Sequence, residues 1–231
     1  MRSLIEKLIA RLKGDPTYRL DPSYSGKQLR HIVYYRGWQF IRGLWIKRWI
    51  SSSGAVFAGR NVIVQHGYQM RSGRNLILEE GVHVNALSDQ GIMLGDNVTI
   101  AKYSILSCTG VIAEKGIGIS IGNNSAIGAQ SFLGGQGGIR IGNDVIMGPH
   151  VKIFSENHNY THASQIIRKQ GHTRLGVTIG NNCWVGAGVT ILDGTSIGDG
   201  CIIAAGSLVS KSIPENSVAM GVPARVVRQR V

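Results

Sequence analysis

A six-residue period in the stretch from Ile179 to Val209 constrains the fold more than any other feature. Its successive blocks read IGNNCW, VGAGVT, ILDGTS, IGDGCI and IAAGSL, and each begins with Ile or Val. A helix repeats apolar residues every three or four positions and a strand every two, so neither element alone explains a period of six. The pattern instead predicts a solenoid, in which each turn buries its apolar residues against its neighbours.

The same period begins loosely near Val56 and makes about seven turns of three blocks each. Three short strands per turn would build a prism with parallel sheets as faces and the first aliphatic residue of each block in the core. Many blocks carry Gly followed by Asn or Asp, which tolerate tight-turn angles. We therefore expect an all-β parallel β-helix over residues 53–213, with a helical N-terminal segment (1–52) and a C-terminal extension (214–231).

Glycine accounts for 32 of the 231 residues, which agrees with many tight turns. The three cysteines form no CxxC pair and we find no secretory leader, so we expect no disulfides, no export and a cytoplasmic location. Cys183 and Cys201 both occupy the fifth position of a block, which predicts two small core residues on adjacent turns.

Residues 1–50 carry eleven Lys or Arg and three Asp or Glu, a net +8 of the chain's +12. Residues 3–13 are expected to form an amphipathic helix. Residues 27–50 mix basic and aromatic side chains and are too charged for a membrane span. Two roles stay open for this segment: a cap over the first strand of the solenoid, or contact with an anionic membrane surface. No nucleic-acid-binding module is recognisable, so no nucleic-acid partner is expected.

The motifs NNCWVGAGVTILDGTSIGDGCIIAAGSLVSK and IPENSVAMGVPARVVR resemble those of the hexapeptide-repeat acyltransferases. The resemblance extends from Ile121 to Arg228 and is clearest to maltose and galactoside O-acetyltransferases and to O-acetyltransferases of bacterial surface polysaccharides. It implies a left-handed β-helix, an exception to the usual right-handed crossover, and a homotrimer with active sites between subunits. The implied activity transfers an acetyl group from acetyl-CoA to a sugar hydroxyl, in capsule, exopolysaccharide or O-antigen biosynthesis.

The repeat breaks for a long insertion, expected as a protruding loop over residues 154–176, and such insertions are often functional. A sugar hydroxyl needs a base to remove its proton, and a neutral imidazole near pH 7 suits that task. The resemblance implies that this base is His158, in SENHNY. We hypothesise that His158 Nε2 accepts the hydroxyl proton during direct attack on the acetyl carbonyl and then protonates the leaving thiolate. A backbone N–H between Trp184 and Ala187 would stabilise the oxyanion.

The resemblance implies further site residues. Glu156 is a candidate to orient the second ring nitrogen of His158, and Asn85 to bind the acceptor sugar, since an amide both donates to and accepts from hydroxyls. Coenzyme A, with its pantetheine arm and phosphates, suits a groove that ends in cations. The residues implied along this groove are Trp184, Gly186, Ala205, Ser210, Lys211, Arg225 and Arg228. The remaining histidines, namely His31, His66, His83, His150, His162 and His172, are expected to be bystanders at the surface or in corners.

Three alternatives stay open. An N-acetyltransferase acting on an amino sugar usually carries a separate nucleotide-binding domain, and residues 1–50 are too short to form one. The γ-type carbonic anhydrases share the solenoid, but their zinc site needs two His five residues apart, whereas His158 and His162 are four apart. We therefore expect no metal. A non-enzymatic β-helix would need neither the His-bearing insertion nor the coenzyme-A-like ending.

Overall fold

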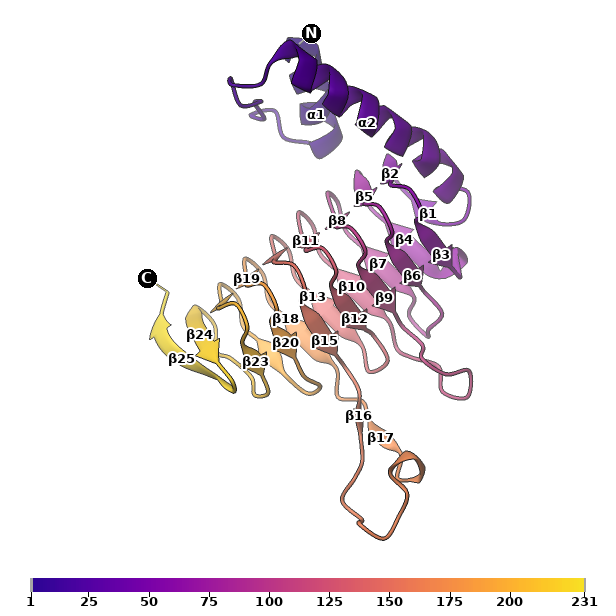
Figure 1. Cartoon of the computed structure of the whole chain (residues 1–231), viewed down its shortest axis with the longest axis vertical. Helices are drawn as coiled ribbons and strands as arrows, with labels where there is room; N and C mark the ends of the chain where they lie inside the picture. Colours follow the sequence, from indigo (N-terminus) through magenta and orange to yellow (C-terminus); the bar gives the residue numbers. More distant parts are fainter. Residues whose placement is uncertain (1, 231) are drawn as a thin grey trace.

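The chain forms a triangular prism with two helices packed beside its first turns (Figure 1). This computed structural model describes residues 2–230. Successive strands visit three sheets in turn, which we call A, B and C, so that each turn adds one strand to each face. The predicted parallel β-helix is confirmed.

Each sheet is a stack of short strands, named below in their spatial order. Sheet A contains β1 (Ser51–Ser52), β4 (Met70–Ser72), β7 (Ile92–Leu94), β10 (Ile119–Ile121), β13 (Ile139–Ile141), β18 (Val177–Ile179) and β21 (Ser196–Ile197). Sheet B contains β2 (Val56–Ala58), β5 (Leu76–Leu78), β8 (Thr99–Ile100), β11 (Ala126–Ile127), β14 (Ile146–Met147), β19 (Trp184–Val185), β22 (Ile202–Ile203), β24 (Ser217–Gly221) and β25 (Ala224–Gln229). Sheet C contains β3 (Ile63–Gln65), β6 (His83–Asn85), β9 (Ile105–Ser107), β12 (Phe132–Gly134), β15 (Lys152–Phe154), β20 (Thr190–Ile191) and β23 (Leu208–Val209).

Register places like residues above one another, as in the pairs Ile121 with Ile141 and Ile141 with Ile179. The aliphatic side chains therefore form one continuous buried core along the prism axis. Cys183 and Cys201 belong to this core, as their block positions predicted, and both are free thiols. Burial raises the pKa of the Cys183 thiol to about 11, so that the thiol stays protonated near neutral pH.

The three corners of the prism differ in length. The A–B corner uses residues with positive φ such as Asn124 (55°), whose side chain donates to Asp144 Oδ1 at 3.1 Å. Asn adopts this left-handed conformation at little cost, which explains the Gly-Asn signal in the repeat. The B–C corner turns equally tightly, with Gly188 at φ 68°. The C–A corner instead carries two long insertions, residues 108–118 and 155–176.

The N-terminal segment contains α1 (Arg2–Lys13) and α2 (Gly26–Ile46). The second helix lies on β2, the edge strand of sheet B, so closely that a Cβ on Gly43 would be 1.7 Å from Val56 O. Arg42 Nε donates to Ala58 O at 3.0 Å and so satisfies a carbonyl near that edge. The helix therefore caps the first turn, which confirms one of its two predicted roles. No helix within residues 2–230 is both long and apolar enough to cross a bilayer.

The C-terminal extension completes sheet B rather than forming a separate unit. β24 pairs in parallel with β22, and β25 turns back antiparallel to β24. Two single-turn 3₁₀ helices, η1 (Gly67–Gln69) and η2 (Ile167–Lys169), lie in C–A connections.

Candidate active site

His158 lies in a hairpin that leaves the prism at the C–A corner (Figure 1). Its stem pairs β16 (Asn157–His158) antiparallel with β17 (His172–Thr173), so that His158 is directly opposite His172. Side chains of directly opposed residues project from the same face of an antiparallel ribbon. The stem thus presents two imidazoles on one face, with His158 exposed and His172 half-buried.

The base of the stem is held by Ser155, which is fully buried. Its Oγ donates to Gly134 O at 2.6 Å and accepts from Gly137 N at 2.9 Å. Gly137 has no room for a side chain, because a Cβ there would lie 1.8 Å from Ser155 O. These contacts fix the point at which the hairpin leaves the prism.

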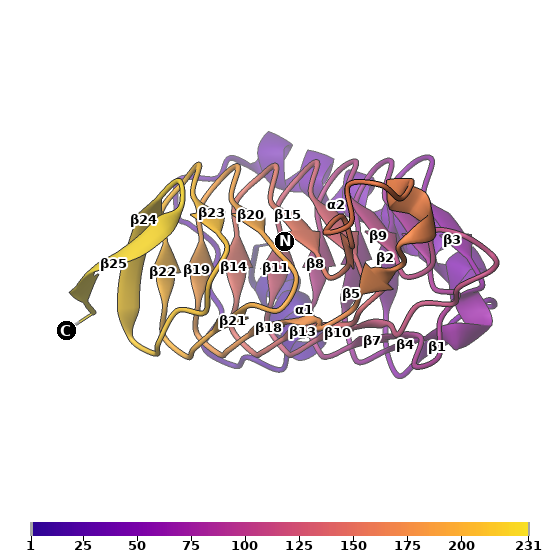
Figure 2. The ribbon, with the colours of Figure 1, turned by 90° about the horizontal axis from the view of Figure 1, so that it is seen from below.

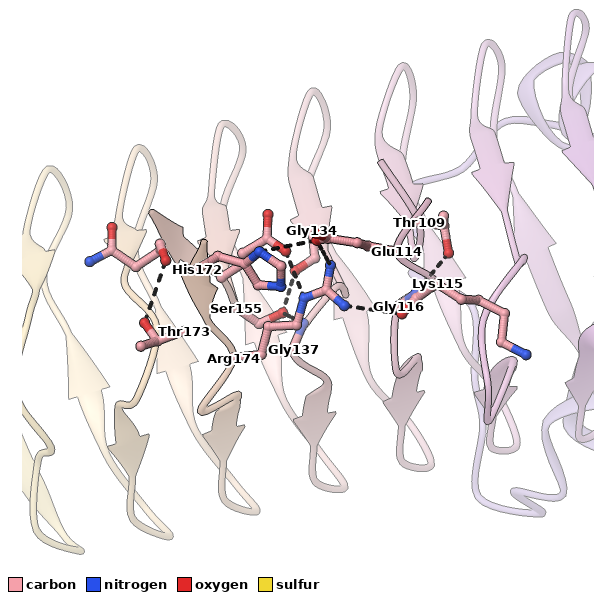
Figure 3. Close-up of polar contacts among 12 residues, drawn as sticks. Thr109, Glu114, Lys115, Gly116, Gly134, Gly137, Ser155, His172, Thr173 and Arg174 are labelled. Carbon is pink, nitrogen blue, oxygen red and sulfur yellow. Dashed lines mark hydrogen bonds and ion pairs between the residues drawn. The ribbon is translucent and has the colours of Figure 1, made fainter. Parts of the chain in front are cut away.

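Glu156 does not contact His158 as the sequence suggested. Its Oε2 accepts a hydrogen bond from Arg174 Nε at 2.7 Å, which joins the residue before β16 to the residue after β17. A guanidinium is a charged donor and binds a carboxylate more strongly than a neutral imidazole does. Arg174 also donates through Nη1 to Lys115 O at 3.0 Å, which links the stem to the 108–118 insertion (Figure 3).

Glu114, from that insertion, lies against the stem (Figure 3). Its Oε2 lies 3.0 Å from His172 Nδ1 and accepts a hydrogen bond from Arg174 Nη2 at 3.5 Å. Glu114, Glu156 and His172 bring three potential metal ligands within 4.8 Å of one another. The guanidinium of Arg174 pairs with both carboxylates, however, and offsets one of their two negative charges, which makes this donor set a poorer site for a divalent metal.

The residues implied for coenzyme A fall into separate places. Trp184 lies in β19 with 55% of its surface exposed, and Arg225 and Arg228 lie in β25 at the end of the same sheet B. Ser210 and Lys211 follow β23 and lie at the C–A corner. In a triangular prism, sheet B is the face opposite that corner. A single chain therefore does not bring its own Trp184 to its own hairpin.

Gly186 and Ala205 stack on adjacent turns at the B–C corner. A Cβ on the buried Gly186 would lie 2.5 Å from Ala205 N, so contact between turns already requires this glycine. The amides of Trp184 and Gly186 donate to carbonyls of the next turn at 2.9 and 2.8 Å. The amide of Ala187, in the corner turn, has no hydrogen-bond partner within residues 2–230. Of the predicted oxyanion donors, it is the amide that is free to bind one.

Asn85 lies in β6, three strands before β15 in sheet C. Its Oδ1 accepts from Leu87 N at 3.2 Å and its Nδ2 donates to Thr109 O at 3.3 Å, so both ends of the amide already bond to backbone. Figures 1 and 2 show the hairpin leaning toward these N-terminal turns. Asn85 is thus on the side of the prism toward which the hairpin leans, with no direct contact to His158.

Comparison with known proteins agrees with this architecture. A family described as "Bacterial transferase hexapeptide (six repeats)" matches residues 176–211. The chain is 30% identical over 149 residues to the putative lipopolysaccharide biosynthesis O-acetyl transferase WbbJ of Escherichia coli K12, covering 62% of this chain and 74% of that protein. The chain belongs to the hexapeptide-repeat transferase family.

Other relatives in the family match over shorter stretches. The galactoside O-acetyltransferase of Escherichia coli K12 is 39% identical over 120 residues, which is 52% of this chain and 58% of that enzyme. Against this relative the chain therefore spans little more than half of the length. A crystal structure of a variant of AntD, an N-acyltransferase from Bacillus cereus in complex with dTDP and coenzyme A, superposes with a TM-score of 0.58 at 20% identity, covering 90% of this chain and 91% of that one. At this identity the likeness shows the fold alone.

Sequence reasoning missed Glu114 and assigned His172 to the bystanders, yet their side chains lie 3.0 Å apart. The available signal was the first break in the repeat, at residues 108–118, which falls at the same corner as the longer break. His150 agrees with the expectation of a histidine at a corner of the prism, because it lies in a tight turn with φ 60°. His83 differs, because it is half-buried on sheet C and its Nε2 has no partner within residues 2–230.

Proposed function

We propose that the protein is an O-acetyltransferase that moves an acetyl group from acetyl-CoA to a sugar hydroxyl in the biosynthesis of a bacterial surface glycan. The observation that carries the proposal is the exposed imidazole of His158 on a braced stem at the long break of a hexapeptide prism. The named activities of the two Escherichia coli relatives support the acyl donor and the sugar acceptor.

In the proposed reaction His158 removes the proton of the acceptor hydroxyl while its oxygen attacks the acetyl carbonyl. The carbon–sulfur bond then breaks, and the imidazolium returns the proton to the leaving thiolate of coenzyme A. General-base assistance of this kind typically contributes about 10²–10⁴ in rate. The N–H of Ala187, which has no hydrogen-bond partner within residues 2–230, is the proposed donor to the oxyanion of the tetrahedral intermediate.

The test follows release of coenzyme A thiol with acetyl-CoA and a panel of mono- and oligosaccharides. His158→Ala should lower acceptor-dependent turnover at least about 100-fold. His162→Ala is the matched control, because His162 is exposed in the same loop and only its backbone forms hydrogen bonds. Full turnover by the His158 variant would refute the assigned base. If calorimetry detects no binding of acetyl-CoA at millimolar concentration, a non-enzymatic β-helix would be favoured instead.

An amine acceptor is the second candidate; it was left open by the sequence, and a protein of the same fold, AntD, is an N-acyltransferase. Amino sugars in the same panel separate the two reactions, because only an O-acetyl product is lost on mild alkaline treatment. The remaining donor contacts are those expected from the sequence: Trp184 lines the coenzyme A groove, and the cations Lys211, Arg225 and Arg228 bind the phosphates. Asn85 remains the proposed acceptor contact.

We propose a homotrimer, because one chain alone separates Trp184 from His158. Sheet C supports this arrangement, since its outer surface exposes apolar residues such as Ile105 (40%) and Phe154 (38%). If sheet C faces a three-fold axis, the C–A corner of each copy meets the B–C corner of its neighbour. The hairpin of one copy and the Ala187 turn of the next then line a shared cleft.

The trimer predicts a mass of about 75 kDa in solution, three times the 24.9 kDa of the chain. Ile105→Asp on sheet C should dissociate it. Met93→Asp is the matched control, because Met93 is equally exposed (40%) but lies on sheet A. A monomeric wild type by light scattering, or dissociation only by the sheet A variant, would contradict the arrangement.

We also propose that the outer face of α2 contacts an anionic membrane surface from the cytoplasmic side. Tyr34, Trp38, Ile41 and Trp45 recur at helical spacing and are all exposed, and Arg48 stacks 4.6 Å from the Trp45 ring. Basic residues beside exposed aromatics suit the headgroup region of anionic lipid. The wild type should co-sediment with phosphatidylserine vesicles but not with phosphatidylcholine vesicles, and Trp38→Ser should release it. Equal binding to both vesicles, or to neither, would contradict the proposal.

A further inference from the structure

We propose that Glu114 is a positioning residue for His158, and that the 108–118 insertion is a brace for the catalytic hairpin. This inference rests on the proposed function for its kinetic consequence. Its structural consequence, the fixing of the stem, stands independently.

The brace is built from two insertions at one corner of the prism. Residues 108–118 leave sheet C after β9, and residues 155–176 leave it after β15, two turns later. Glu114 of the first insertion lies beside His172 of β17 (Figure 3). Glu114 and Lys115 of the first insertion contact His172 and Arg174 of the second.

The contacts hold β17, and β17 holds His158. Glu114 Oε2 lies 3.0 Å from His172 Nδ1, and His172 is the direct cross-strand partner of His158. The stem has only two pairs of residues, so its own backbone bonds are too few to be stable alone. The side chains of His172 and Arg174 are only 20% and 18% exposed, whereas Glu114 is 46% exposed, so solvent screens these contacts on the Glu114 side only.

The contact also limits how the His172 ring can turn. An ionised carboxylate can only accept a hydrogen bond, so the ring is held with Nδ1 toward Glu114. Glu114 thereby fixes the orientation of the ring that lies beside His158 on the same face of the stem.

Glu114→Ala removes both contacts, and a misplacement of about 1 Å at a catalytic group can cost about 100-fold in rate. We expect kcat to fall at least about tenfold, with the KM for acetyl-CoA unchanged because the donor groups lie on other elements. Glu114→Gln keeps an acceptor for His172 Nδ1 and should retain most of kcat. His172→Ala removes one of these two contacts and should lower kcat less than Glu114→Ala, and the double variant should fall little below Glu114→Ala, because the His172 contact is already lost there.

Asp89→Ala is the matched control. Asp89 pairs with Lys115 of the same insertion at 2.7 Å but touches no described residue of the hairpin through its side chain. Native-state hydrogen exchange over residues 155–176 supplies a readout independent of activity: exchange should accelerate in Glu114→Ala and not in Asp89→Ala. Unchanged exchange in Glu114→Ala overturns the brace, even if the protein proves to have no transferase activity. Unchanged kcat in an active protein, or equal losses in both variants, overturns the positioning role.

Discussion

The docking of α2 on the prism can be tested with two glycines of the same helix. Gly43 faces β2, where a Cβ would lie 1.7 Å from Val56 O, whereas a Cβ on Gly37 meets no atom within 4 Å. Alanine favours a helix over glycine by about 1 kcal/mol. The same substitution should therefore have opposite signs: Gly37→Ala stabilises α2, and Gly43→Ala pushes it off the sheet.

The size of the effect follows from the contact. At Gly43 the helix must retreat by about 1.3 Å for the new Cβ to reach 3.0 Å, the shortest separation that real Cβ atoms show. That shift lengthens the bond from Arg42 Nε to Ala58 O (3.0 Å) and strains the one from Gln39 Nε2 to Glu79 Oε2 (2.8 Å). Overpacking costs about 1–3 kcal/mol and each lost hydrogen bond about 1 kcal/mol. After the gain in helix propensity, the net cost is about 2–4 kcal/mol.

Hydrogen exchange of residues 26–46 is the appropriate assay, because α2 can open without unfolding the prism. Gly43→Ala should accelerate exchange there about 30- to 1,000-fold, the factor that corresponds to about 2–4 kcal/mol. Gly37→Ala should slow it by up to about fivefold. If Gly43→Ala leaves exchange unchanged or slows it, the close approach of α2 to β2 is wrong.

Three further predictions concern the donor site, the acid limit of stability and the cysteines. Trp184→Ala should raise the KM for acetyl-CoA about tenfold or more with the fold intact by circular dichroism; an unchanged KM would exclude this indole from the donor groove. Hydrogen bonds from Arg74 lower the pKa of Asp96. The stability that this carboxylate contributes is therefore present above its unfolded pKa of about 3.9 and is lost as pH falls through the lower folded pKa. Asp96→Asn should make the melting temperature depend less on pH between about 2 and 4, and an unchanged dependence would contradict the pairing with Arg74. Burial raises the pKa of Cys108 to about 12 and that of Cys183 to about 11. The native protein should therefore not react with a thiol reagent at pH 8, whereas the denatured protein should react at all three cysteines. Fast labelling of the native protein would contradict the burial of the cysteines.

The prism could be predicted from the sequence because its signal is local and repeated. Each block carries its own core residue, such as Ile179 or Val185, and its own turn residues, so a misread block is corrected by its neighbours. The cysteines followed the same logic, since the fifth position of each block points inward. The long insertion likewise begins just after Phe154, the last residue of β15, where the six-residue period stops.

The candidate site was less predictable because its contacts join insertions that have no period. Glu114 and His172 lie 58 positions apart, and nothing in either segment specifies the other. Glu156 shows the opposite error, in which proximity in sequence to His158 suggested a contact that Arg174 takes instead. Which carboxylate meets which base depends on the lengths and paths of two loops. The paths of these two loops cannot be predicted from residue composition or spacing.

The separation of the two halves of the proposed site is nevertheless encoded in the phase of the repeat. Three blocks make one turn, so every block has a face: Ile179 belongs to sheet A, Val185 to sheet B and Ile191 to sheet C. The long break falls between a C block and an A block, whereas Trp184 precedes the core residue of a B block. A base at the C–A corner and an indole on the opposite face cannot meet within one triangular prism. The position of each block within its three-block turn therefore predicts that a site using both His158 and Trp184 needs two copies of the chain.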